Sequence, residues 1–452
     1  MPSLRGRTAD MTRGPVGRQL LLFALPILGA SFIQQLYNTV DLFFVGQVLG
    51  TNATAAVGAS SLLTTCIVGF FTGLAVGTGV VISQAAGEKN QEKIHRVIHT
   101  AAGLSLAGGV LLTILGVAVS RQILIWMNTP AEILEQALLY VRVYLLSMLP
   151  LFIYNINAGI IRAKGDSRTP MLFQLLGMGI HVILNWICLN HLGMDVDGAA
   201  WSTLLSQIAA AAGTVLYLMR QRDAYHLQWS KIRIHRGVLA SILRLGVPAG
   251  IQNMVITISN IFVQTAINGL GVDEMAAFTA YFKVELVIYL PIVALGQAVT
   301  TFAGQNLGAG KKDRIEKGVR SCLKMGILYA AAAAVLLLLF GAAAFRLFTA
   351  EQKVIEIGLR IIRVTFPFYW LYVILEVCAD VLRGIGQSFP PMLIILICMC
   401  AVRTVLLAVF CNIWNSLEAV AAVYPCAWLA AAFCLALRWK KEYNKWKRSA
   451  VS

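Results

Sequence analysis

Charged residues are scarce in this sequence, and acidic ones are the scarcer kind. Only 13% of its 452 residues are Asp, Glu, Lys or Arg, against about 25% in an ordinary soluble domain. Acidic residues number 21 and basic residues 37, whereas hydrophobic residues make up 58% of the chain. No single core could bury so much apolar chain. The composition therefore excludes a water-soluble protein and predicts a membrane protein.

Motifs for catalysis and for metal binding are also missing. The nine cysteines lie in or beside apolar stretches without a Cys-x-x-Cys pair, so neither a disulfide framework nor a zinc site is expected. The sequence contains no His-Glu-x-x-His, Gly-x-Ser-x-Gly, P-loop or Gly-x-Gly-x-x-Gly pattern. We therefore expect no enzyme, metal or cofactor. Any transport must be driven by an ion gradient or by the substrate's own gradient.

Long apolar stretches are what the sequence has in abundance. They are continuously apolar, as in residues 327–341, and the strands of an outer-membrane barrel would instead alternate polar and apolar residues. The sequence predicts an all-α polytopic membrane protein with twelve transmembrane helices. The expected spans are 20–48, 55–82, 97–120, 134–160, 170–192, 197–219, 241–268, 275–304, 321–345, 354–381, 390–413 and 417–437.

The basic residues predict how these spans are oriented. Of the 37 Lys and Arg residues, 27 lie in the N-terminal tail, the C-terminal tail and alternate loops, and only Arg121, Arg346 and Lys353 lie in the opposite loops. Under the positive-inside rule, both termini are cytoplasmic and the number of spans is even. We expect a multi-pass protein of the plasma (inner) membrane that contacts the lipid bilayer and binds no nucleic acid.

An internal repeat divides the chain. A shift of 221 residues aligns Leu49-Gly50 with Leu270-Gly271, Gln84 with Gln305, Arg162 with Arg383, Gly165 with Gly386 and Pro170-Met171 with Pro391-Met392. Because each half holds six spans, the halves are expected to be parallel repeats, an architecture typical of transporters. The predicted parts are a tail (1–17), a six-helix lobe (18–220), a linker (221–240), a second six-helix lobe (241–437) and a basic tail (438–452).

Several motifs resemble one transporter family. The first span carries Leu25-Pro26 and then the run from Gln34 to Asp41. Ser83-Gln84-Ala85-Ala86-Gly87 and the run from Gly304 to Gly310 follow the second and eighth spans. Together with the motifs after the fourth and tenth spans, these residues resemble the multidrug and toxic compound extrusion (MATE) family over nearly the whole chain. The resemblance implies a two-lobed bundle of twelve helices that exports organic compounds, often cationic and lipophilic, against inward flow of protons or sodium ions.

One departure from that family concerns the fifth span. Many relatives carry an Asn-x-x-x-Asp pair there, which joins the first-span Asp in a cation site, but the matching positions here are His181 and Asn185. The seventh span, where the sodium-coupled branch has a carboxylate, contains none between Gly246 and Gly271. Hard cations prefer several oxygen ligands. We therefore expect proton rather than sodium coupling.

Asp41 is the leading candidate for a coupling-ion site in the first lobe. It lies about 10 Å inside the outer end of its span, where a charged carboxylate costs on the order of 2.5 to 3.5 kcal/mol. A proton or a cation would compensate that charge. The structural alternative is that Asp41 only packs between helices and is held by Tyr37 or by a neighbouring amide. His181 and Asn185 lie four residues apart on one helix face, and a histidine can exchange a proton near neutral pH. Thr203 of the sixth span completes this candidate group.

The second lobe has its own intramembrane charges. Glu285 of the eighth span and Glu376 of the tenth are candidates for a second coupling site, and Lys283 is a possible counter-charge for one of them. Asp380 shares a helix face with Glu376 and lies one turn from Arg383. We expect Asp380 and Arg383 to form an ion pair that fixes the end of the helix.

Two further patterns favour structural roles. Gly69, Gly73 and Gly77 form successive Gly-x-x-x-Gly steps in the second span, a spacing that lets helix backbones approach closely. His95 and His99 are four residues apart, but two ligands with Arg96 between them make a poor metal site. We expect these histidines at the wetted end of the third span.

The preferred function is export of a small-molecule substrate by cation antiport, carried out by a monomer. A lipid-linked oligosaccharide flippase of a related fold is an alternative. Such a flippase would need a groove lined by several basic residues, and the intramembrane residues Arg142, Arg360, Arg363 and Arg403 could supply them. A membrane-embedded transferase is a third hypothesis. It is disfavoured because the sequence lacks the paired polar catalytic residues that such an enzyme needs.

Overall fold

In a computed structural model, residues 10–127, 129–414 and 416–451 are described. No strand occurs among these residues, and twelve of their helical segments are long and apolar enough to cross a membrane. The prediction of an all-α protein with twelve spans is therefore confirmed. Residues 1–9 of the expected N-terminal tail lie outside the described residues.

The chain divides into two compact units. Unit 1 is formed by Gly29–Gly250, with which Asp10 is grouped, and unit 2 by Met11–Leu28 and Ile251–Ser452. The division falls inside two helices, α1 (Val16–Val48) and α8 (Arg236–Asn268). The lobes expected from sequence, 18–220 and 241–437, instead assign each of these helices to a single lobe. The first part of α1 belongs to unit 2 and its second part to unit 1. The first part of α8 belongs to unit 1 and its second part to unit 2.

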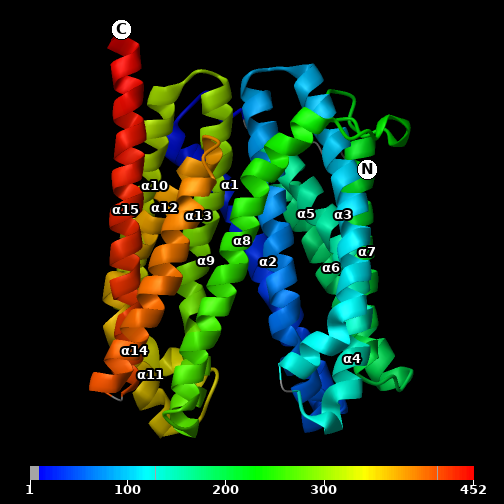
Figure 1. The fold of residues 1–452 in the computed structure, drawn as a ribbon, viewed down its shortest axis with the longest axis vertical. Helices are drawn as coiled ribbons and strands as arrows, with labels where there is room; N and C mark the ends of the chain where they lie inside the picture. The colour runs from blue at the N-terminus through cyan, green and yellow to red at the C-terminus, as the bar shows by residue number, and fades with distance from the viewer. Residues whose placement is uncertain (1–9, 128, 415, 452) are drawn as a thin grey trace. The chain divides into compact units, whose positions relative to one another are not determined.

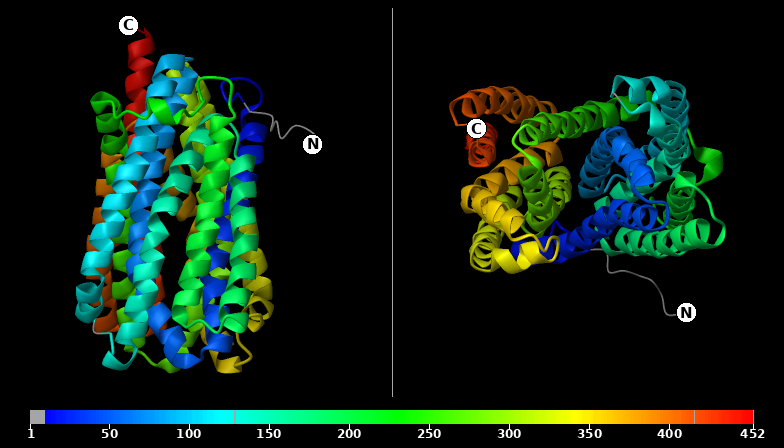
Figure 2. Two further views of the ribbon diagram at one scale, coloured as in Figure 1. Left: turned by 90° about the vertical axis from the view of Figure 1, so that its right-hand side faces the viewer. Right: turned by 90° about the horizontal axis from the view of Figure 1, so that it is seen from below.

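Unit 1 contains the second part of α1 and the first part of α8, with five spans between them. The bounds of its other helices are α2 Thr51–Gly87, α3 Gln91–Trp126, α4 Ala131–Leu146, α5 Met148–Ala163, α6 Arg168–Trp186, the π-helix η1 Ile187–His191, α7 Val196–Met219 and the 3₁₀ turn η2 Trp229–Lys231. In the views of Figure 2 these helices run roughly along one direction, as expected for a bundle of spans.

Unit 2 repeats this arrangement. Its other helices are α9 Val272–Gly308, α10 Lys312–Arg346, α11 Gln352–Thr365, the 3₁₀ turn η3 Phe366–Phe368, α12 Tyr369–Gly384, α13 Phe389–Leu396, the π-helix η4 Ile397–Val402, α14 Arg403–Ile413 and α15 Leu417–Val451. Within this unit, the turn from α9 to α10 and the C-terminal end of α15 lie at one end, whereas α11 and α14 lie at the other (Figure 1).

The 221-residue repeat is visible in the helix boundaries. Helices α2 and α9 are both 37 residues long, and their first and last residues match under the shift. The residue before each is a glycine with positive φ, 84° at Gly50 and 150° at Gly271. Glycine reaches such angles without the penalty that a Cβ atom would impose. The repeated Leu-Gly motif thus marks a tight turn between the first two helices of each half.

Two spans that look continuous in sequence are interrupted. The fourth breaks at Ser147, between α4 and α5, and the tenth breaks at the turn η3 between α11 and α12. A proline lies close to each break, Pro150 in the first case and Pro367 in the second. Because proline has no backbone N–H, it cannot complete the helical hydrogen-bond ladder across these points.

The glycines of α2 pack against α8 within unit 1. A Cβ atom placed on Gly73 would lie 2.1 Å from the Gly250 nitrogen, and one on Gly77 would lie 2.5 Å from the Gly246 nitrogen. Both distances are to backbone, which cannot rotate away. The two helices therefore meet backbone to backbone, as the Gly-x-x-x-Gly spacing predicted.

The first residues of the described chain are fastened to unit 2. Gln305 accepts a hydrogen bond from the backbone N–H of Met11 through Oε1 at 3.1 Å, and Asn306 donates Nδ2 to the Met11 oxygen at 3.1 Å. Arg314 donates Nη1 to the Gly14 oxygen at 3.0 Å. Met11 is fully buried. The Gln-Asn pair at the end of α9 therefore anchors the chain segment that leads into α1.

Candidate functional site

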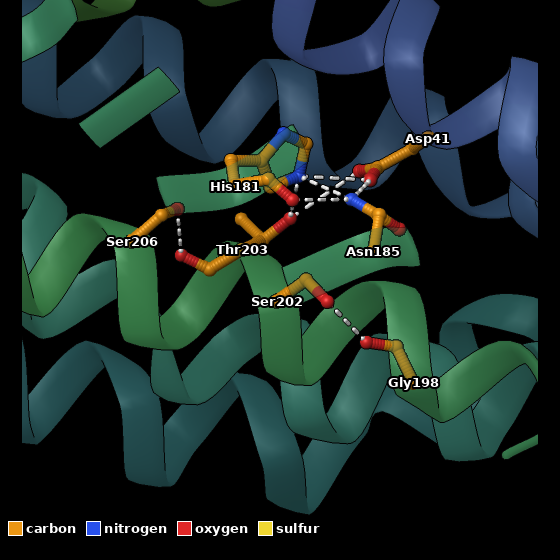
Figure 3. A network of polar contacts seen from close by, with 7 residues as sticks. All are labelled: Asp41, His181, Asn185, Gly198, Ser202, Thr203 and Ser206. Atoms are coloured by element: carbon orange, nitrogen blue, oxygen red, sulfur yellow. Dashed lines mark hydrogen bonds and ion pairs between the residues drawn. The ribbon is translucent and has the colours of Figure 1, made fainter. Parts of the chain in front are cut away.

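Asp41 lies in the second part of α1 and is buried, with 2% of its surface exposed. Helix α6 brings His181 and Asn185 to it, both fully buried and one turn apart. Helix α7 contributes Thr203, also buried. Figure 3 shows the four polar ends pointing toward one another from three helices. The structure thus gathers residues from three spans of unit 1 around one carboxylate.

Both oxygens of this carboxylate have polar partners. The Oδ1 atom of Asp41 lies 2.9 Å from Nε2 of His181 and accepts a hydrogen bond of 3.1 Å from Nδ2 of Asn185. The Oδ2 atom accepts one of 3.3 Å from the hydroxyl of Thr203. The Asp41 charge is therefore compensated by donors at fixed positions, which lowers the cost of burying it.

His181 lies at the centre of these contacts. Its Nε2 atom is 3.1 Å from the Thr203 hydroxyl and 3.0 Å from Nδ2 of Asn185, besides its contact with Asp41. An Nε2 that carries a proton donates to the carboxylate, whereas a bare Nε2 accepts from the hydroxyl or the amide. The contacts of Nε2 therefore accommodate this atom either as a donor or as an acceptor.

Three tyrosines lie near the group. The ring of Tyr37, one turn before Asp41, lies 4.6 Å from the His181 ring, centroid to centroid. Tyr140 and Tyr144 of α4 lie within electrostatic reach of Asp41, and neither is among the residues predicted from sequence. Their spacing of four residues on one helix face was a signal available in the sequence, but tyrosines inside an apolar span are usually read as packing.

Few oxygen atoms surround the Asp41 carboxylate. The Asp41 group offers two carboxylate oxygens, the Thr203 hydroxyl and the Asn185 amide, and an imidazole nitrogen occupies the space against Oδ1. A hard cation takes six or more oxygen ligands in its usual protein sites. Within the described ranges, no set of three or more His, Cys, Asp or Glu side chains could hold a metal ion.

In unit 2 the predicted ion pair is present. Arg383 donates Nη1 to Oδ1 of Asp380, three residues earlier on α12. Thr300 of α9 donates its hydroxyl to the Asp380 backbone oxygen at 3.1 Å. Directly after this pair, Gly386 has a φ of 89° and donates its N–H to the Arg383 oxygen at 2.8 Å. Asp380 and Arg383 thus stabilise the end of α12, where a glycine terminates the helix.

The two glutamates of unit 2 are placed differently. Glu285 accepts hydrogen bonds through Oε1 from the hydroxyls of Tyr369 and of Tyr281, the latter at 3.3 Å. Glu376 is half-buried on α12, one turn before Asp380. Lys283 is exposed, and among the described residues no ion pair joins it to either glutamate. The neutralising role considered for Lys283 is therefore not seen.

Two of the four basic residues named for a flippase groove share one environment, because Arg360 and Arg363 line the same pocket in unit 2 together with Lys353. The other two lie elsewhere. Arg403 is buried on α14, and Arg360 forms an exposed ion pair of 2.7 Å with Glu418. Arg142 and Arg363 are exposed.

The histidine pair of α3 has a structural role. Nε2 of His99 accepts a hydrogen bond of 3.2 Å from the backbone N–H of Gln228, and Nδ1 lies 2.8 Å from the His95 oxygen. His99 is buried, not wetted as expected, because the linker before α8 folds over it. The hydrogen bond from Gln228 to the His99 ring holds that linker against α3.

Comparison with known proteins identifies one family. The MatE family model matches residues 26–187 and again residues 248–409. The probable multidrug resistance protein YoeA of Bacillus subtilis (strain 168) is 28% identical over 396 residues, covering 86% of this chain and 85% of that protein. The probable multidrug resistance protein YpnP of the same organism is 28% identical over 446 residues, covering 97% of both. The two matched ranges correspond to the two halves of the repeat.

Solved structures share the fold. A crystal structure of a MATE protein in its bent conformation superposes with a TM-score of 0.92 at 24% sequence identity, covering 99% of this chain and 100% of that chain.

Proposed function

Because this chain belongs to the MatE family, whose members are membrane transporters and not enzymes, we propose that it exports lipophilic organic compounds, many of them cationic, in exchange for protons. The names of its relatives, both probable multidrug resistance proteins, support drug export. The observation that carries proton coupling is the 2.9 Å contact between His181 and Asp41.

Charge balance supplies the physical reason. With His181 neutral and Asp41 ionised, the buried group carries one net negative charge, and with His181 protonated it carries none. A net charge inside the membrane is costly, so gaining or losing one proton changes how favourably the α1, α6 and α7 segments pack together. A proton can thus bias the equilibrium between two arrangements of these helices, which is the requirement for coupling.

Sodium is the less favourable coupling ion for this group. To bind Asp41, a sodium ion would have to displace the His181 ring from Oδ1, and it would then find only one carboxylate. Asn185 stands where a second carboxylate would supply further oxygen ligands, and an amide carries no charge to balance the cation.

The proposal includes a location. The excess of Lys and Arg in the two tails and in alternate loops supports an inner-membrane protein with both termini in the cytoplasm. The Asp41 group then lies in the outer half of the bilayer, where a proton can reach it from the external side. A monomer would suffice, because the donors around Asp41 all come from one chain.

Reconstituted vesicles test this function. Liposomes that contain the purified protein are loaded with ethidium. Efflux of the dye is followed by fluorescence while a proton gradient and a sodium gradient are imposed separately. We expect efflux to follow the proton gradient and to stop when a protonophore is added. Efflux driven by a sodium gradient at constant pH, and insensitive to the protonophore, would overturn proton coupling while leaving drug export in place.

A further inference from the structure

The last turns of α15 extend past the apolar part of their span (Figure 1). Residues 417–437 contain one charged residue, Glu418, whereas residues 438–448 contain six Lys or Arg residues and one acid. Five of these six basic residues are exposed. They form the basic face, which consists of Lys440, Lys441, Lys445, Lys447 and Arg448.

The opposite side of this helical stretch is held by unit 2. Tyr443 donates its hydroxyl to Oε2 of Glu316 on α10, and Nζ of Lys312 lies 5.6 Å from the Trp446 ring centroid. The rings of Trp439 and Trp446 lie 5.7 Å apart between centroids. These contacts fix the rotation of the helix, so the basic face points away from α10.

No acid of the same stretch neutralises the basic face. Glu442 is buried, with 8% of its surface exposed. Within the part of the chain that the structure describes, none of the five basic side chains forms an ion pair with an acid. Lys447 lies 4.9 Å from the Tyr443 ring centroid, a contact that cancels no charge. Five positive charges therefore share one side of the helix without a counter-charge.

An exposed apolar row on α15 leads into the basic face. Leu429, Phe433 and Leu437 are 56%, 63% and 51% exposed, and their spacing of four residues places them in one row on the helix surface. Exposed apolar side chains of a span are a surface for lipid tails. With about 3.6 residues per turn, Lys440 and Lys447 lie on the same side of the helix as this row. The charges therefore continue the surface that the lipid tails cover.

Distances along the helix match a lipid headgroup. At about 1.5 Å per residue, Lys440 lies about 4.5 Å and Lys447 about 10.5 Å further along the axis than Lys440, so the face spans one short segment just beyond Leu437. The polar layer on each side of the hydrocarbon core is roughly 5 to 8 Å thick. Long basic side chains extend back toward it, and the screening length in physiological salt is about 8 Å. The basic face is therefore within electrostatic reach of the headgroups.

We propose that the basic face binds the headgroups of anionic phospholipids. A lipid whose tails lie along Leu429, Phe433 and Leu437 has its phosphate beside Lys440 and Lys441. A basic segment next to a span attracts a headgroup of net negative charge, such as phosphatidylglycerol, more strongly than neutral phosphatidylcholine. The continuity with the apolar row favours a lipid over a soluble acidic partner. This inference goes beyond drug export and holds whichever ion drives it.

Lipid preference in the absence of any gradient tests the basic face. Full-length protein in mild detergent is titrated against pyrene-labelled phosphatidylglycerol and, separately, against pyrene-labelled phosphatidylcholine, and fluorescence anisotropy reports each dissociation constant. We expect the wild type to bind the anionic lipid about tenfold more tightly. The preference should fall as NaCl is raised from about 0.1 M to about 0.5 M, because salt screens exposed charges.

Two variants with the same change in net charge locate the effect. The tail variant should lose the preference to within about twofold, and it carries Lys440→Gln, Lys441→Gln, Lys445→Gln, Lys447→Gln and Arg448→Gln. The linker variant is the matched control, with changes at five exposed positions of unit 1, namely Arg220→Gln, Arg222→Gln, Lys231→Gln, Arg233→Gln and Arg236→Gln. It should keep the wild-type preference within about twofold. Size-exclusion chromatography confirms that both variants are folded.

Three results would contradict the proposal. A tail variant with the wild-type preference would show that the basic face does not bind lipid, and equal losses in both variants would show that only the total charge matters. Displacement of the labelled lipid by millimolar glycerol phosphate, which has no acyl chains, would identify a site for a soluble phosphate instead. Loss confined to the tail variant supports the proposal, even if efflux proves to be driven by sodium.

Discussion

Nε2 of His181 and Oδ1 of Asp41 lie 2.9 Å apart in a fully buried part of unit 1, although 140 positions separate the two residues in the chain. The contact places an imidazole against a carboxylate. The coupling predictions follow from this pair.

Asp41→Asn should abolish coupled efflux and leave drug binding largely intact. The variant keeps the side-chain shape and removes the charge that the proton balances. Drug binding should persist because the proton and the drug are expected to bias the same helix movement from different sites. Ethidium efflux under a proton gradient and ethidium binding in detergent are measured on the same preparation. Efflux at the wild-type rate would show that Asp41 is not a coupling residue, and loss of binding together with efflux would show that one site serves both ligands.

His181→Gln should reduce proton-driven efflux at least about tenfold, because glutamine can donate to Asp41 but cannot titrate. Thr203→Val is the matched control. It removes a neighbouring hydrogen bond and no titratable group, so we expect a smaller loss. Equal losses in the two variants would indicate that His181 acts only by positioning Asp41.

The double variant His181→Asn/Asn185→Asp should respond to sodium. It replaces the imidazole with an amide and adds a second carboxylate near Asp41, which supplies the oxygen ligands that a hard cation prefers. Efflux is measured under a sodium gradient at constant pH, with the wild type alongside. If efflux by the variant stays indifferent to sodium, the number of carboxylates around Asp41 does not decide which ion is coupled.

Gly77→Ala should destabilise unit 1 by more than the roughly 1 to 3 kcal/mol typical of an overpacked core, because the new methyl group would meet the Gly246 backbone at 2.5 Å. Gly79→Ala is the matched control, since its nearest neighbour would lie at 3.7 Å, an ordinary contact. Thermal unfolding in detergent should show a lower midpoint for the first variant only. Equal midpoints would mean that α2 and α8 separate without cost.

Asp380→Asn should be more destabilising than the double variant Asp380→Asn/Arg383→Gln. Removing one partner of a buried ion pair costs about 3 to 5 kcal/mol because the remaining charge is unpaired, whereas removing both avoids that penalty. Unfolding midpoints of the wild type, both single variants and the double variant complete the cycle. Additive effects would show that the two side chains do not stabilise one another.

Much of this protein is determined by local sequence. A span must be largely apolar and helical because lipid cannot satisfy backbone polar groups, so hydropathy alone predicts twelve spans. Charge counts predict their orientation, and a constant shift of 221 residues reveals the repeat. Asp41 was also identifiable alone, because a buried charge in a span is costly wherever its neighbours lie.

Tertiary structure decided which side chains meet. Sequence placed His181 and Asn185 on one helix face, but only packing of α1, α6 and α7 brings them to Asp41. Packing of α4 adds Tyr140 and Tyr144 near the carboxylate. Likewise, the rings of Tyr289, Tyr372 and Trp428 in unit 2 come together from three helices. Hydropathy constrains each span separately, whereas the rotation and register of one helix against another depend on side-chain fit between residues far apart in the chain.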